Sequence, residues 1–126
     1  MALLLDTNVI LFGLMEPTRI PNHVRRMIES ENATCVLSVV SLYEIGLKTA
    51  LGKLPIPSSF DLVQHLRQSG ISILNVTPRH ALRAAALPLE HRDPWDRFIV
   101  AQCLVEGHQL VSADTMISGL GIARIW

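Results

Sequence analysis

The chain has 126 residues, of which 49% are hydrophobic and 17% charged, and its formal net charge is zero at pH 7. This length fits one domain of ordinary size, and the high apolar content excludes a disordered chain. No apolar run reaches the roughly 18 residues of a membrane span, and no secretory signal opens the chain. We therefore expect a single cytoplasmic domain over residues 1–126, with some apolar surface left for a partner.

The first element is a short, continuously apolar run from Ala2 to Leu5. Such a run predicts a strand that is buried on both faces, as in the middle of a parallel sheet. Asp6 follows directly, at the position where open α/β sheets bind their ligands. Asp is also a favoured helix N-cap, and for Asp6 taken alone this structural explanation is the better one.

The rest of the chain alternates between apolar strand patterns and helical periodicity. Further strands are predicted over residues 33–37, 71–76, 109–112 and 123–126. Helices are predicted over residues 9–15, residues 23–31 after an Asn22 cap, residues 38–51, a segment opened by Ser58 or Ser59 and closed by Gly70, residues 77–87 and residues 95–106. Cys35 and Cys103 lie in apolar stretches without metal-binding spacing, which predicts buried free thiols.

Strands that alternate with helices favour a parallel sheet with helices on both faces. We therefore predict an α/β fold, with three α/β/α layers around a central parallel sheet of four to five strands. Right-handed crossovers place the carboxyl ends of all strands on one edge. Asp6 and Asp114 follow the first and fourth strands, so they are neighbours if the strand order reverses between those two strands.

Glu44 has two interpretations. With Ser41 as N-cap and Glu44 at N3, the pair forms a capping box. The apolar pattern instead favours an earlier helix start at Ser38, which puts Glu44 on the second turn, where capping does not explain it. Lys48 lies four residues on and can pair with Glu44 for roughly 0.3–0.5 kcal/mol, which is compatible with either interpretation.

Asp93 and Pro94 predict the start of the helix that runs to residue 106. Asp93 fits an N-cap, Pro94 fits the first helical position, and Asp96 then falls at N3. Asp96 has a structural alternative as an acid that complements the helix dipole, for about 0.3–1 kcal/mol. Asp114 has the same kind of alternative, as the N-cap of a following helix.

Together, Asp6, Glu44, Asp96 and Asp114 place four carboxylates where a parallel sheet gathers the ends of its elements. Such charges repel unless a cation lies among them, and oxygen-only ligation suits Mg²⁺ or Mn²⁺. These ions activate water and stabilise phosphoryl transition states. If Asp93 joins the four, six acids remain against eleven Lys and Arg, an excess of about five positive charges that suits a polyanionic substrate.

At these positions the chain resembles the PIN-domain ribonucleases, specifically the VapC-like toxins of type II toxin–antitoxin pairs. The similarity covers nearly the whole chain, in order and at familiar spacing. The matching segments are Leu4-Leu5-Asp6-Thr7-Asn8, Ser41-Leu42-Tyr43-Glu44-Ile45 with Lys48, Gly52-Lys53-Leu54-Pro55, His91-Arg92-Asp93-Pro94-Trp95-Asp96-Arg97 with Ala101-Gln102, and Ser112-Ala113-Asp114.

The resemblance implies a PIN-like fold and an endoribonuclease that uses Mg²⁺ or Mn²⁺ to hydrolyse RNA, leaving a 5′-phosphate and a 3′-hydroxyl. It also implies a homodimer and a cognate antitoxin that binds DNA. The acids that it assigns to metal binding and catalysis are Asp6, Glu44, Asp96 and Asp114, with Asp93 as a secondary candidate. The residues expected to order these acids or to hold substrate are Thr7, Asn8, Ser112, Arg97 and Lys48.

Other interpretations stay open at this point. His91 is either a phosphate contact or a solvated turn residue, and Trp95 is expected in the core or an interface. A magnesium-dependent phosphatase with Asp6 as nucleophile is the enzymatic alternative. Such phosphatases have a second Asp two residues after the first, where this chain has Asn8. A catalytically weak RNA-binding or interaction module is the non-enzymatic alternative, and metal-dependent RNA cleavage that is lost in Asp6→Asn separates the alternatives.

Overall fold

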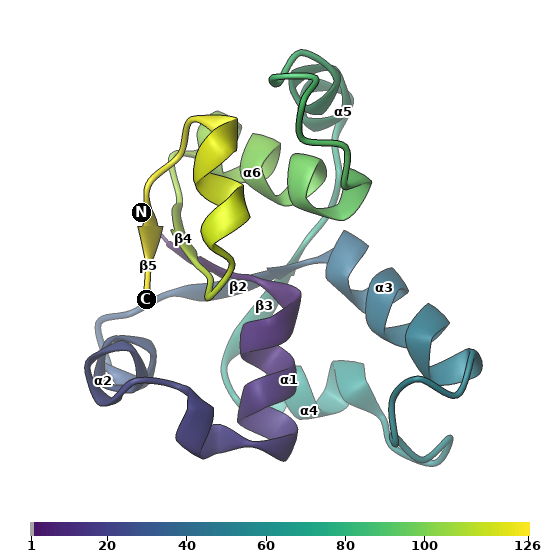
Figure 1. The fold of residues 1–126 in the computed structure, drawn as a ribbon. Coiled ribbons are helices and arrows are strands. Elements are labelled where there is room, and N and C mark those ends of the chain that lie inside the picture. Colours follow the sequence, from purple (N-terminus) through teal and green to yellow (C-terminus); the bar gives the residue numbers. More distant parts are fainter. Residues whose placement is uncertain (1) are drawn as a thin grey trace.

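A five-stranded parallel sheet lies at the centre of the computed structural model, which describes residues 2–126 (Figure 1). In spatial order the strands are β3 (Ile71–Leu74), β2 (Cys35–Ser38), β1 (Leu3–Leu5), β4 (Gln109–Val111) and β5 (Arg124–Ile125). Each strand runs parallel to its neighbours. The predicted fold class is confirmed. The order reverses at β1, which lies between β2 and β4, so the condition under which Asp6 and Asp114 follow neighbouring strands is met.

Helices cover both faces of the sheet and complete the three predicted layers (Figure 1). On one face lie α1 (Thr7–Met15), the short 3₁₀ helix η1 (Pro17–Arg19), α2 (Asn22–Glu29), α3 (Val39–Ala50) and α4 (Leu62–Gln68). On the other lie α5 (Pro78–Ala85), α6 (Pro94–Glu106) and the 3₁₀ helix η2 (Thr115–Leu120).

The alternation of side chains along the strands divides the core into two apolar clusters. Leu4 on β1 points into the cluster beneath α5, α6 and η2. Its neighbours Leu3 and Leu5 point into the cluster beneath α1 to α4. Because successive strand residues face opposite sides, a strand covered on both faces must be apolar at every position, as the run of three leucines is.

Several element ends differ from the sequence prediction. Asn22 is the first residue of α2 rather than its cap. Neither Ser58 nor Ser59 caps α4; the Asp61 side chain does so, accepting a 3.0 Å hydrogen bond from the Gln64 backbone N–H. A carboxylate at a helix N-terminus also complements the helix dipole, which favours Asp61 over the nearby serines.

The two cysteines, Cys35 and Cys103, are buried free thiols, as predicted. Gly107 ends α6 with φ near +70°, a left-handed conformation that favours glycine. Within residues 2–126, no helix combines the length and the apolar character needed to cross a bilayer.

Candidate active site

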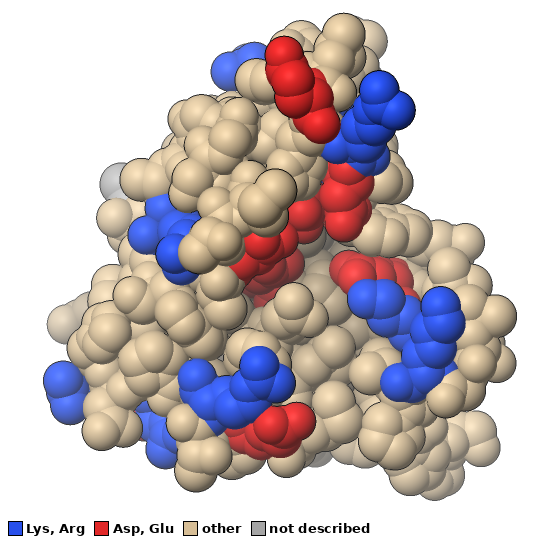
Figure 2. Space-filling model, viewed as in Figure 1, with Lys and Arg blue, Asp and Glu red and all other residues tan. Residues whose placement is uncertain are grey.

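The four acids lie on elements that meet at the carboxyl edge of the sheet. Asp6 follows β1 and Asp114 lies just beyond β4, its neighbour in the sheet. Glu44 is on the second turn of α3, and Asp96 is on the first turn of α6. Figure 2 shows acidic side chains gathered in a cleft at the middle of this face, with Lys and Arg side chains along its edges.

Asp6 is both a helix cap and a member of this cluster. It is buried, and its two carboxylate oxygens accept hydrogen bonds from the Thr7 backbone N–H at 2.7 Å and from the Ser112 hydroxyl at 2.6 Å. Burial raises the pKa of Asp6, these two hydrogen bonds lower it, and the charges of Glu44 and Asp114 raise it further. The cap predicted for Asp6 therefore exists, and it does not exclude a further role in the acidic cluster.

Glu44 is held by two side chains, one from each of two helices, and a third side chain contacts it through Thr7. Thr7 Oγ1, on α1, lies 2.8 Å from Glu44 Oε1 and 2.8 Å from Ser41 Oγ. An ionised carboxylate only accepts, so the Thr7 hydroxyl donates to Glu44 and accepts from Ser41. Lys48 Nζ donates to Glu44 Oε2 at 2.7 Å. α3 begins after Ser38, so the capping-box interpretation of Ser41 and Glu44 is wrong.

Asp96 is paired with His91 in the loop before α6. His91 Nε2 and Asp96 Oδ2 are 2.9 Å apart, and both side chains are 13% exposed. Burial raises the pKa of Asp96 to about 6, the hydrogen bond from His91 lowers it, and the charges of Asp93, Asp6 and Asp114 raise it. Asp93 caps α6 as predicted, accepting from the Trp95 and Asp96 backbone N–H groups.

Ser112 connects Asp114 to Asp6. Its hydroxyl oxygen accepts a 3.0 Å hydrogen bond from the Asp114 backbone N–H while it donates to Asp6. Asp114 caps η2 by accepting from the Met116 backbone N–H at 2.9 Å. The cap predicted for Asp114 thus exists, although on a 3₁₀ helix that the sequence did not predict.

Two of the residues expected to order the acids, Arg97 and Asn8, form no hydrogen bond to them among the described residues, whereas Thr7, Ser112 and Lys48 do. The Arg97 guanidinium braces the α5–α6 loop instead of the carboxylates or a phosphate. It donates to the backbone carbonyls of Ala84, Ala85, Leu87, Pro88 and His91. Backbone carbonyls at the end of a helix lack internal partners, which explains why they draw in a guanidinium. The Asn8 side chain is exposed at the start of α1.

The sequence did not predict that Ser41 and His91 contact the acidic cluster. Ser41 is three residues before Glu44 and therefore on the same side of α3, a spacing that could have indicated its contact with the cluster. His91 is separated from Asp96 by a turn and a helix start, and the contact depends on how the loop folds back. Trp95 is half-buried and packs against Tyr43 of α3, with ring centroids 5.4 Å apart, so it lies at a contact between two helices and not in the core.

The donor set fits a hard divalent cation. It consists of carboxylates at the ends of four elements, with hydroxyls beside them and an imidazole that is already paired. Among residues 2–126, no three His, Cys, Asp or Glu side chains already converge as ligands of one ion. The carboxylates are instead turned to the protein donors described above, and each oxygen that accepts one hydrogen bond keeps a second lone pair for an ion.

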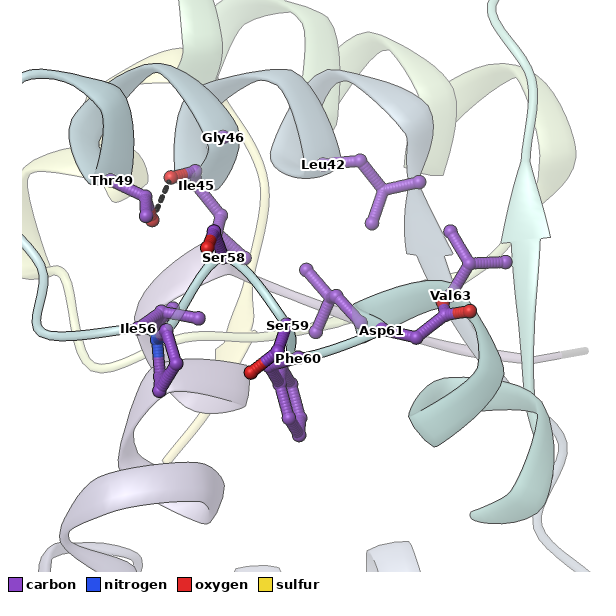
Figure 3. Close-up of a pocket in the computed structure, with 12 residues that line it drawn as sticks. Leu42, Ile45, Gly46, Thr49, Ile56, Ser58, Ser59, Phe60, Asp61 and Val63 are labelled. Carbon is purple, nitrogen blue, oxygen red and sulfur yellow. Dashed lines mark hydrogen bonds between the residues drawn. The ribbon is translucent and has the colours of Figure 1, made fainter.

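A separate hollow of about 630 Å³ lies between α3 and residues 56–63 (Figure 3). Leu42, Ile45 and Thr49 line it from α3, and Phe60 lies on the opposite wall. At 100° per residue these α3 positions are on the side of the helix away from Glu44. The hollow is therefore a different surface from the acidic cleft.

Comparisons with known proteins agree with this architecture. The family model described as PIN domain matches residues 3–122. A DNA-bound VapBC structure from Salmonella typhimurium is 20% identical with a TM-score of 0.75, covering 99% of this chain and 97% of that chain. VapBC2 from Rickettsia felis, bound to a promoter DNA fragment, is 16% identical with a TM-score of 0.74. The match covers 99% of this chain and 98% of that chain.

FitAcB from Neisseria gonorrhoeae is 23% identical with a TM-score of 0.70, covering 98% of this chain and 96% of that chain. No curated protein matches the chain. At these identities the solved structures show a shared fold.

Proposed function

This chain belongs to the PIN domain family, and from that premise we propose that it is a metal-dependent endoribonuclease, the toxin of a type II toxin–antitoxin pair. The observation that carries the proposal is the gathering of Asp6, Glu44, Asp96 and Asp114 from four separate elements at one sheet edge. Capping explains single acids of this set, but it does not explain why they lie near one another. Burial is the main cause that raises the pKa of Asp6 and of Asp96, and the charges of neighbouring acids raise both further.

In this proposal the chain holds its carboxylates ready for Mg²⁺ or Mn²⁺. Ser112 fixes Asp6, Thr7 and Lys48 fix Glu44, and His91 fixes Asp96. A divalent ion held there would supply positive charge that activates water and stabilises the transition state of phosphodiester hydrolysis. Fixed carboxylates lower the cost of reorganisation during the reaction. Asp93, which caps α6, is a secondary ligand candidate.

RNA is the proposed substrate because the acidic cleft is edged by basic side chains (Figure 2). Once an ion neutralises the cleft, the surface outside it carries the excess of Lys and Arg, which attracts a polyanion. The expected products are a 5′-phosphate and a 3′-hydroxyl.

The deciding experiment incubates purified protein with RNA and Mg²⁺ or Mn²⁺. We expect cleavage that excess chelator and Asp6→Asn both abolish. Cleavage that persists in chelator, or products that end in a 2′,3′-cyclic phosphate, would contradict this mechanism. Release of phosphate from a phosphomonoester without RNA cleavage would favour the phosphatase alternative, and RNA binding without cleavage would favour an interaction module.

We further propose two protein partners, a cognate antitoxin and a second copy of this chain. The structural relatives include two VapBC assemblies and a toxin–antitoxin complex from Klebsiella pneumoniae. Leu82 on α5 and Leu89 after it are largely exposed, so apolar surface is available for symmetric pairing. Light scattering at micromolar concentration tests the homodimer, and a monomer across salt conditions would contradict it.

A further inference from the structure

His91 is fixed at both its side chain and its backbone by two consecutive residues of α6. Its Nε2 is 2.9 Å from Asp96 Oδ2, and its carbonyl oxygen accepts a 2.8 Å hydrogen bond from Arg97 Nη1. Because an ionised carboxylate only accepts, Nε2 carries the hydrogen and donates it to Asp96. The two contacts close a ring between the loop and the first turn of the helix.

The loop that carries His91 is itself held against α5. Arg97 Nη1 donates to the Pro88 carbonyl at 2.6 Å, and Nη2 donates to the carbonyls of Ala84 and Leu87 at 2.8 and 2.9 Å. A guanidinium is planar and permanently charged, so several such bonds set the loop in one orientation. The position of the imidazole is therefore determined by the fold rather than by chance contact.

The His91–Asp96 hydrogen bond is not needed to begin α6. Asp93 accepts from the backbone N–H groups of Trp95 and Asp96, and Pro94 has no N–H to satisfy. The phosphate contact considered for His91 is also disfavoured, because the imidazole N–H is already given to a carboxylate and the side chain is only 13% exposed. The remaining explanation of the His91–Asp96 hydrogen bond is its effect on the Asp96 carboxylate.

We propose that His91 is the positioning residue for Asp96: it holds Oδ2 and so fixes the orientation in which the carboxylate would meet a divalent cation. This inference rests on the proposed function, since it takes Asp96 as a metal ligand. Carboxylates that bind metals are themselves hydrogen-bonded, and removal of such outer partners typically costs about 10–100-fold in metal affinity or activity.

The test compares amide substitutions of different reach. The Gln side-chain amide nitrogen reaches the place of imidazole Nε2, whereas the shorter Asn amide does not. Calorimetric titration of the purified protein with Mn²⁺ should show His91→Ala and His91→Asn binding about 10–100-fold more weakly than wild type. His91→Gln should recover most of the affinity, and His23→Gln on the exposed surface of α2 should bind as wild type.

A purely structural role would lower the melting temperature of metal-free protein without separating Gln from Asn. The inference is overturned if His91→Asn binds Mn²⁺ as well as His91→Gln does, or if wild-type protein binds no Mn²⁺. Because both amide variants keep a polar side chain of similar type, their comparison decides the matter even if His91→Ala does not fold. If Gln and Asn separate as expected but wild type cuts no RNA, the inference stands and the proposed function fails.

Discussion

The Ser112 hydroxyl donates a 2.6 Å hydrogen bond to Asp6 Oδ2 across the junction of β4 and β1, between residues 106 positions apart in the chain. Both residues are buried, and Ser112 also accepts from the Asp114 backbone N–H. One side chain thus couples the two acids that follow neighbouring strands. A site assembled at this edge depends on the register between β1 and β4, in which Leu5 lies opposite Val111.

Replacing Ser112 tests this coupling. Ser112→Ala removes the donor that opposes the raised pKa of Asp6 and leaves the Asp114 N–H without its acceptor. We expect the rate of RNA cleavage to fall by about 10–100-fold and stability to fall by about 1–3 kcal/mol, measured by denaturant unfolding. Ser112→Thr keeps the hydroxyl and is the matched control. Equal losses in both variants would show that packing, not the hydroxyl, matters.

Neutralising the clustered acids should separate activity from stability. Asp6→Asn, Glu44→Gln, Asp96→Asn and Asp114→Asn should each reduce cleavage by about 100-fold or more, because each weakens the site for the cation that would stabilise transition-state charge. Without metal, their melting temperatures should equal or exceed that of wild type, because each substitution relieves carboxylate repulsion. Glu31→Gln, at an exposed position, is the control. Large losses of stability in all four variants would contradict this account.

Asp93 should behave in the opposite way. Asp93→Ala removes the cap of α6 and should cost about 1 kcal/mol in free energy of unfolding. Asp93→Ser keeps a capping oxygen and should recover most of that loss, while both variants cleave RNA at saturating metal. If Asp93→Ala abolishes cleavage at unchanged stability, Asp93 is a ligand rather than a cap.

Asp96 should make metal-free protein less stable as the pH rises. Its pKa is raised from 3.8 to about 6 in the folded chain. Between these values the folded state binds more protons than the unfolded state, so the free energy of unfolding decreases with pH. The stability that the protonated Asp96 contributes is fully present below pH 3.8 and is lost by pH 6. Its size is on the order of 2–3 kcal/mol.

Unfolding curves of wild type and Asp96→Asn should therefore converge near pH 4 and differ most above pH 6, with the variant more stable. Because histidines titrate in the same range, the same comparison is repeated with His91→Gln in both proteins, one with Asp96 and one with Asp96→Asn. A pH-independent difference between the two proteins would contradict the raised pKa.

The antitoxin should place a cation among the four acids. A guanidinium is planar and donates paired hydrogen bonds to carboxylates, so an Arg from the partner can occupy the place of the ion. We expect that copurified complexes lose inhibition when one basic residue in the toxin-binding segment of the antitoxin is replaced. If every such variant inhibits as well as the parent, inhibition arises from steric cover or from disruption of a dimer.

The sequence alone determined the parts of this molecule that depend on neighbours along the chain. The apolar run before Asp6 predicted a central strand, and the spacing of Asp93, Pro94 and Asp96 predicted the first turn of α6. Start signals and side-chain periodicity act within a few residues, so they can be interpreted without the fold. The rule that parallel crossovers are right-handed placed the strand ends on one edge, but the strand order itself, with β1 between β2 and β4, came only from the structure.

The tertiary structure alone decided which partner each polar side chain takes. Arg97, expected near the carboxylates, binds the carbonyls at the end of α5, and His91, expected in solvent or at a phosphate, holds Asp96. Thr7 joins Ser41 to Glu44 across two helices. Buried donors and acceptors must be satisfied by whatever lies within about 3 Å, and for these residues the neighbours come from distant elements that only the folded chain brings together.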